Sequence, residues 1–328
     1  MHLEEKIKRT MRGGLISAVP VPRYESGQIH EAAQAAYARY LAAQRIAGVA
    51  VWVHTGRGLY LSREQRQYIL HSWKSALHDS QVVICGVGAL QNDALKGSEQ
   101  LKKWQSDSIT MAKDAISGGA DALLVFPPVI LNPLPERERE DAVVAYHSAL
   151  AALGCPLILF YLYEAAGGMA YSLELLRRLL AIPGVIGIKI ATLDSVMTMQ
   201  RTARLLEQEF PDQLHITGED RMFGYALMRG AQSALVGLGA AFPNVQADLI
   251  TAFQENRYAD FIDLSARVDG FAEETFTEPM DKYILRMLHC LAAAKVIPEE
   301  AAFDIAGYEM TKEELAEIRK AIGDYRLY

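Results

Sequence analysis

A lysine interrupts a stretch that is otherwise uncharged and rich in β-branched side chains, Gly184-Val-Ile-Gly-Ile-Lys-Ile190. This composition indicates a buried strand. Burying an ammonium group is costly because the loss of water disfavours its charged form. The same desolvation lowers a lysine pKa, so the neutral amine of Lys189 becomes available as a nucleophile towards a carbonyl carbon. In the alternative interpretation, only the aliphatic stem is buried and the charged head reaches solvent at the strand end.

Eight short apolar segments are predicted as strands, and a predicted helix follows each of them. They cover residues 15–19, 49–53, 82–85, 122–126, 157–161, 185–190, 214–217 and 234–236. Uniformly apolar strands are typical of a parallel sheet that is buried on both faces. The pattern therefore predicts an α/β fold, a (β/α)8 TIM barrel. A doubly wound sheet is the alternative, but Pro20-Val21-Pro22 stands where that fold needs its glycine-rich turn.

The chain divides into two predicted parts, a barrel over residues 1–244 and a C-terminal helical extension over residues 245–328. We expect the extension to pack on the barrel flank or on another subunit. Residues 1–13 are predicted as a polar lead-in. Residues 92–106 are predicted as a polar, irregular insertion over the strand ends, with a short helix as the alternative, and a helix follows over 107–117.

Side chains that could do chemistry gather where the predicted strands end. These are His54, Thr55, Gly56 and Arg57 after the second strand, Tyr161 at the fifth, Lys189 at the sixth, and Gly218, Glu219 and Asp220 at the seventh. In a barrel of this kind the active site lies at the carboxyl ends of the strands. The shared position of these groups favours the nucleophile interpretation of the lysine.

The chain resembles the dihydrodipicolinate synthase/N-acetylneuraminate lyase family of Schiff-base aldolases from about Leu15 to Asn244. Gly187-Ile-Lys189 is similar to the G-I-K strand of that family, and Tyr161 stands 28 positions before the lysine, which is the spacing of the family's catalytic tyrosine. Three further segments carry the resemblance: His54-Thr-Gly-Arg57 with Leu61-Ser62, Gly118-Gly-Ala-Asp-Ala122 with Pro127-Pro128, and Gly218-Glu-Asp220.

The resemblance implies a metal-independent class I aldolase or lyase that needs no cofactor. A 2-oxo acid, such as pyruvate or a deoxy sugar acid, would form an imine with Lys189 and thereby gain an electron sink for bond cleavage. Tyr161 would shuttle protons, while the Thr55 hydroxyl and the backbone amides near Gly56 would hold the substrate carboxylate. Gly218 matches a glycine of the family's seventh strand. The resemblance also implies a homotetramer or a homodimer.

Departures from the family pattern argue against the lysine-biosynthetic reaction for this chain. His54 replaces a loop threonine and Arg57 replaces a glutamate. His54 could act as an acid or base, or cap a backbone carbonyl. Arg57 could bind a carboxylate or phosphate, or pair with Glu164 or Asp220 in a structural ion pair.

Two assignments stay open. Tyr161 could instead be a core tyrosine with one hydrogen bond, and Phe160 is a rival for its position because Pro156 falls one residue early for the family pattern. Glu219 and Asp220 could instead be acids that complement a helix N-terminus. A dehydratase with the same imine chemistry, or a non-catalytic protein that binds a sugar acid on the same barrel, are alternative functions.

Composition limits the partners. The 328 residues carry a net charge of −7 and 51% hydrophobic residues, with no basic tract, so neither nucleic acid nor a membrane is an expected partner. No signal peptide is expected at the start of the chain. The three cysteines are far apart and predict buried free thiols in a cytoplasmic protein. The histidines lack metal-site spacing.

Overall fold

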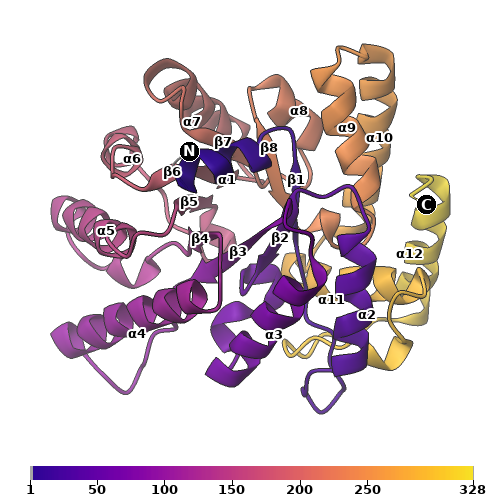
Figure 1. The fold of residues 1–328 in the computed structure, drawn as a ribbon, viewed down its shortest axis with the longest axis horizontal. Helices are drawn as coiled ribbons and strands as arrows, with labels where there is room; N and C mark the ends of the chain where they lie inside the picture. Colours follow the sequence, from indigo (N-terminus) through magenta and orange to yellow (C-terminus); the bar gives the residue numbers. More distant parts are fainter. Residues whose placement is uncertain (1–2, 328) are drawn as a thin grey trace.

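Eight parallel strands close into a barrel in the computed structural model, which describes residues 3–327 (Figure 1). The first strand pairs with the last, which excludes an open doubly wound sheet and confirms the TIM barrel. The strands are β1 Leu15–Ala18, β2 Gly48–Val51, β3 Val82–Val87, β4 Ala122–Val125, β5 Leu157–Leu162, β6 Val185–Ala191, β7 Leu214–Thr217 and β8 Ser233–Val236.

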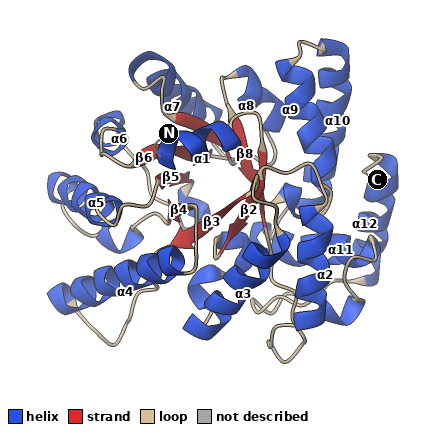
Figure 2. Ribbon diagram, viewed as in Figure 1, coloured by secondary structure: helices blue, strands red, loops and turns tan. Residues whose placement is uncertain are grey.

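Helices surround the strands as an outer ring (Figure 2). Those that follow the strands in order are α2 Glu31–Ala42, α3 Arg63–Ala76, α4 Gly97–Ser117, α5 Glu136–Ala151, α6 Leu173–Leu180, α7 Val196–Glu209, α8 Phe223–Met228 and α9 Pro243–Gln254. Ser62 and Gln65 form a capping box at the start of α3, because each side chain bonds the other residue's backbone N–H. None of the described helices is long and apolar enough to cross a membrane.

The predicted polar lead-in is wrong, because residues Leu3–Met11 form helix α1. Ile7 and Met11 lie one turn apart on the same face, and both are buried in the cluster that also contains Ile16 and Leu214. The helix lies across the strands in Figure 1. Its charged residues other than Lys8 are exposed, which explains why the segment looks polar in sequence.

The predicted irregular insertion is also mostly helical. Helix α4 begins at Gly97, so only the first residues of the range 92–106 stay in a loop. Trp104, Ser108 and Met111 share one face of the helix and are buried. A single apolar residue per turn among many polar ones gave too weak a pattern to predict the helix.

The C-terminal part consists of α10 Tyr258–Thr275, α11 Tyr283–Ala293 and α12 Lys312–Asp324. These helices cover one flank of the barrel beside α2 and α9 (Figure 1). The boundary predicted at residue 244 falls inside α9, the barrel's eighth outer helix. The segment between α10 and α11 is more than an appendage, because it returns to the carboxyl ends of the strands, as described below.

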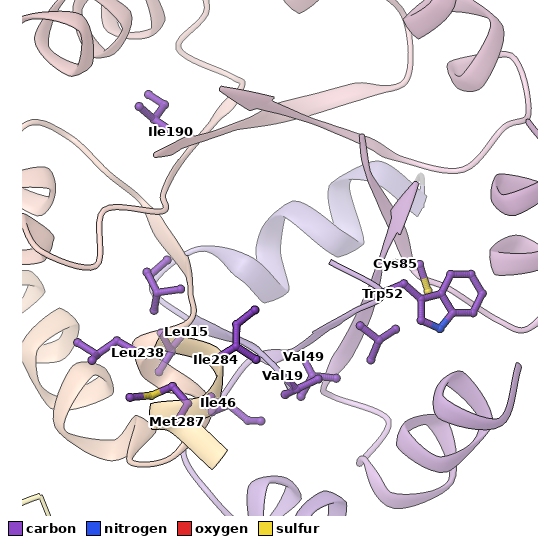
Figure 3. Close-up of a cluster of buried hydrophobic side chains, with 14 of the residues drawn as sticks. Leu15, Val19, Ile46, Val49, Trp52, Cys85, Ile190, Leu238, Ile284 and Met287 are labelled. Carbon is purple, nitrogen blue, oxygen red and sulfur yellow. The ribbon is translucent and has the colours of Figure 1, made fainter. Parts of the chain in front are cut away.

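Alternation along the strands separates two faces. In β5 and β6, Phe160 and Lys189 line the barrel interior, whereas Tyr161 and Ile190 belong to the buried layer between strands and helices. Figure 3 shows part of that outer layer, including Ile190 and Cys85. The three cysteines are free and buried, as predicted.

Candidate active site

A cavity of about 400 Å³ opens at the carboxyl ends of the barrel strands. It is lined by His54 after β2, Lys189 near the end of β6, Gly218 after β7 and Gly237 after β8. Of the residues that the sequence predicts for the site, the cavity is lined by His54, Thr55, Arg57, Lys189, Gly218 and Asp220. Among the described residues, no group of three His, Cys, Asp or Glu side chains is arranged to hold a metal ion.

Lys189 is buried at the base of this cavity, with 9% of its surface exposed. Its Nζ lies 4.5 Å from the centre of the Phe160 ring. Burial lowers the pKa of the amine to about 8, although the negative charges of Asp220 and Glu219 oppose the shift. A lysine with such a pKa has a substantial neutral fraction near pH 7, which is what nucleophilic attack requires.

Gly218 is the close neighbour of the lysine. A Cβ atom at this position would lie 2.4 Å from the Lys189 Cε and 3.1 Å from the Ala191 Cβ. The glycine therefore leaves the space that the lysine stem occupies. The sequence matched Gly218 to the family only by its position, and these distances explain in steric terms why a glycine stands there.

Two acids follow the glycine, and the structure separates their roles. Glu219 is fully buried, and its Oε1 accepts hydrogen bonds from the backbone N–H (2.6 Å) and the hydroxyl (2.8 Å) of Thr192. Asp220 lines the cavity, and its Oδ1 accepts the N–H of Leu238 at 2.8 Å. Burial raises the pKa of Glu219 to about 7 and that of Asp220 to about 6. Helix α8 begins at Phe223, with Met222 as its N-cap and no acid in its first turn, so neither acid caps this helix, which was the alternative from sequence.

Phe160, not Tyr161, occupies the β5 position beside the lysine. Phe160 is paired with Lys189 in the β5–β6 register and lines the cavity. Tyr161 points to the helical layer, where its ring centre lies 5.2 Å from that of Tyr171. The predicted tyrosine is thus on the wrong face of the strand to act at Lys189, because neighbouring residues of a strand face opposite sides. The alternative from sequence, with Phe160 at this position, fits the structure.

The loop after β2 presents His54 and Thr55 to the cavity. Its backbone is tightly turned: Trp52 has φ 59°, and a Cβ on Gly58 would lie 1.6 Å from the Trp52 carbonyl oxygen. The Gly56 N–H donates to the Val53 carbonyl at 3.0 Å, and Gly56 is not a lining residue. The predicted use of this amide for a substrate carboxylate is therefore not supported by its geometry.

His54 contacts the segment just before α11, and Thr55 contacts the first residue of α11. The His54 Nε2 lies 2.8 Å from the Asp281 Oδ1, and the Thr55 hydroxyl lies 2.8 Å from the Tyr283 hydroxyl. The hydrogen bond from His54 lowers the pKa of Asp281 to about 2, with a further contribution from Arg57. His54 pairs with a carboxylate and does not cap a backbone carbonyl.

Arg57 forms ion pairs that hold the C-terminal segment on the barrel. Its Nη1 lies 2.6 Å from the Asp281 Oδ2, and its Nε and Nη2 bind Asp304 at 3.0 and 2.6 Å. Burial opposes the charge of this side chain, but the two carboxylates raise its pKa above the ordinary value. The arginine is thus a structural ion pair, as one interpretation predicted, with partners other than Glu164 and Asp220.

Sequence reasoning missed the residues that the C-terminal segment adds to the cavity. Phe276, Met280, Asp281 and Tyr283 all line it. Asp281 and Tyr283 lie more than 200 positions from their partners in the β2 loop, so no local spacing could indicate these contacts. The one available signal was the unexplained charge of Arg57, which needs a partner when buried.

Comparison with known proteins supplies the family. The model of the dihydrodipicolinate synthetase family matches residues 11–297. The chain belongs to this family. Human N-acetylneuraminate lyase is 27% identical over 252 residues, which cover 75% of this chain and 72% of that protein. An uncharacterized DapA-like lyase of Chloroflexus aurantiacus is 27% identical over 247 residues, which cover 74% of this chain and 75% of that protein.

Solved structures of the family share the fold over nearly the whole chain. The sialic acid aldolase of Ruminococcus gnavus superposes with a TM-score of 0.80 at 20% identity, covering 97% of this chain and 98% of that one. A monomeric dihydrodipicolinate synthase variant superposes with a TM-score of 0.82 at 16% identity and the same coverage of each chain. Together with relatives that are named as lyases, the family match establishes this chain as an enzyme of the lyase type.

Proposed function

We propose that this enzyme is a class I lyase in which Lys189 forms an imine with the carbonyl carbon of a 2-oxo acid. The observation that carries the proposal is the buried lysine at the base of the cavity, whose pKa of about 8 leaves neutral amine near pH 7. Imine formation expels water, and the protonated imine accepts the electron pair of a C–C bond that breaks at the neighbouring carbon. Hydrolysis returns the lysine.

The carboxylate of the 2-oxo acid is proposed to bind the hydroxyl pair of Thr55 and Tyr283. Both residues line the cavity and are buried. Two hydroxyls that already face each other at 2.8 Å can both turn towards an anion, and each can donate one hydrogen bond to it. This pair replaces the predicted amide of Gly56.

Protons require a carrier other than the residue at position 160, because phenylalanine has no hydroxyl. Asp220 shares the cavity with Lys189, and burial brings its pKa to about 6, so it can both accept and donate a proton near neutral pH. His54 is the second candidate, as the sequence predicted, and Asp281 fixes its ring orientation. We assign proton transfer to Asp220, and we assign to His54 a place in the cavity lining without a role in proton transfer.

Borohydride trapping tests the imine. Incubation of the protein with pyruvate and sodium borohydride should add the mass of one reduced pyruvate, whereas the Lys189→Arg variant should stay unmodified. The Asp220→Asn variant keeps the bond to the Leu238 N–H, so it should still form the adduct but lose about 100-fold or more in turnover. Absence of an adduct with every 2-oxo acid offered would refute the proposal.

A dehydratase uses the same imine, and the product separates the two reactions: an aldehyde from C–C cleavage, or an unsaturated or dioxo acid from loss of water. We further propose a cytoplasmic enzyme, supported by three buried free thiols, and a homo-oligomer, as the resemblance to the family implies. Sedimentation of the purified protein measures the oligomeric state.

A further inference from the structure

We propose that the outer part of the cavity binds an apolar group, so that the substrate is a 2-oxo acid with an aromatic or branched aliphatic end. The inference rests on the proposed imine at Lys189, which fixes the 2-oxo acid end of the molecule at the cavity base. It concerns the opposite end of the substrate, which points towards the mouth. It also replaces the deoxy sugar acid that the sequence suggested.

The wall above the lysine is predominantly apolar. Six large apolar side chains from five different segments line it: Leu90, Phe126, Leu162, Leu193, Phe276 and Met280. Leu90 keeps 44% of its surface exposed at the mouth, which is costly for an apolar side chain without a partner. Such a concave apolar wall gains free energy when it excludes water against an apolar ligand group.

The charged groups of the cavity are largely engaged with one another. Arg57 is bound by Asp281 and Asp304, and Asp281 also pairs with His54. Asp220 accepts the Leu238 N–H through one oxygen. A chain of sugar hydroxyls would have to compete with these bonds or stand unpaired against apolar side chains, and unpaired buried polar groups are costly.

The apolar wall is held in place by polar bonds behind it. Leu90 follows Ala89, whose carbonyl accepts the indole N–H of the buried Trp104 at 2.8 Å. This bond ties the loop after β3 to helix α4. Leu90 is therefore held over the mouth, which reduces the entropy lost when a ligand binds against it.

The other two loops show the same arrangement. Leu193 follows Thr192, which Glu219 binds through two hydrogen bonds. Phe276 lies in a segment whose carbonyls accept three hydrogen bonds from the buried Arg286, at 2.7 to 3.3 Å. Three independent anchors behind apolar side chains indicate a preformed wall and not a chance exposure of hydrophobic residues.

The test compares three 2-oxo acids by borohydride trapping on the full chain: pyruvate, 2-oxo-4-phenylbutanoate and 2-oxo-3-deoxygluconate. The measured quantity is the concentration that gives half-maximal adduct. The same half-maximal concentration is measured for each acid with a free primary amine in place of the protein. Dividing the protein value by the amine value corrects for the fraction of each acid in the open keto form. We expect the phenyl acid to trap at a concentration at least tenfold lower than the sugar acid.

The outcomes separate this inference from the proposed function. If pyruvate forms the adduct but the sugar acid traps at an equal or lower concentration than the phenyl acid, the apolar wall is refuted and the imine stands. If none of the three acids forms an adduct, the imine proposal fails and this inference fails with it. A preference of tenfold or more for the phenyl acid supports both.

A pair of variants locates the preference in the wall. Leu90→Asn should reduce the ratio of phenyl to pyruvate affinity at least fivefold, because it places an amide against the apolar group. Leu173→Asn is the matched control, since Leu173 is 38% exposed at the start of α6 and does not line the cavity. Equal ratios in Leu90→Asn and in the control would contradict the assignment of the wall.

Discussion

Replacement of Gly218 by alanine tests how the barrel positions its lysine. The added Cβ would lie 2.4 Å from the Lys189 Cε, whereas ordinary contacts between such atoms are at 3.4–4 Å. The lysine must therefore move by about 1 Å, and misplacement of a reacting group by ~1 Å can cost about 100-fold in rate. Movement of the new methyl group is blocked, because the Ala191 Cβ and the Ile190 carbonyl oxygen each lie 3.1 Å from it.

The assay is the rate of borohydride trapping with pyruvate, measured beside thermal unfolding. We expect the Gly218→Ala variant to fold, to lose about 1–3 kcal/mol of stability through overpacking, and to trap about 100-fold more slowly. Gly323→Ala in α12 is the control, because a Cβ there meets no atom within 4 Å. A trapping rate equal to that of the control would refute the view that Gly218 sets the position of the lysine.

Three further predictions concern charged and titratable side chains of the cavity and its supporting ion pairs. The trapping rate should rise about tenfold per pH unit below the Lys189 pKa of about 8 and level off above it, because only the neutral amine attacks; a flat profile between pH 6 and 8 would contradict this. Asp304→Asn should lower the free energy of unfolding by about 3 kcal/mol, because Asp304 is 2% exposed and binds Arg57 with two bonds. Urea unfolding measures this loss. Glu299→Gln is the control, because it removes only an exposed ion pair with Arg319 and should change the free energy little. His54→Ala should leave adduct formation with pyruvate intact and lower turnover less than Asp220→Asn does, because proton transfer is assigned to Asp220; a loss of turnover equal to that of Asp220→Asn would contradict this assignment.

The barrel could be predicted from sequence because each strand is a short apolar run between helices, a local pattern that tertiary packing does not change. Lys189 could be located for the same reason, since a charge within such a run is conspicuous. Helix α1 could not be predicted, because its buried face consists of only Ile7, Lys8 and Met11. Its remaining residues are polar, so the segment resembles a loop.

The neighbours of the lysine were harder to predict. A shift of one residue decides whether Phe160 or Tyr161 faces the lysine, and spacing along the chain cannot distinguish these two cases. The β5–β6 register, with its irregularity between Leu157 and Ile158, places Phe160 beside the lysine. The contacts of Arg57 with Asp281 were beyond reach, because the two residues are 224 positions apart. Local patterns therefore defined the scaffold, while long-range contacts completed the site.

The most direct test of the central claim is a tryptic peptide map after trapping with pyruvate and borohydride. Trypsin cleaves after unmodified lysine, so the free protein yields separate peptides 179–189 and 190–201. If Lys189 forms the imine, reduction blocks this cleavage, and one joined peptide 179–201 should appear with the mass of one reduced pyruvate. Cleavage after Lys189 at the level of the untreated protein, or an adduct on another lysine alone, would contradict the proposed chemistry.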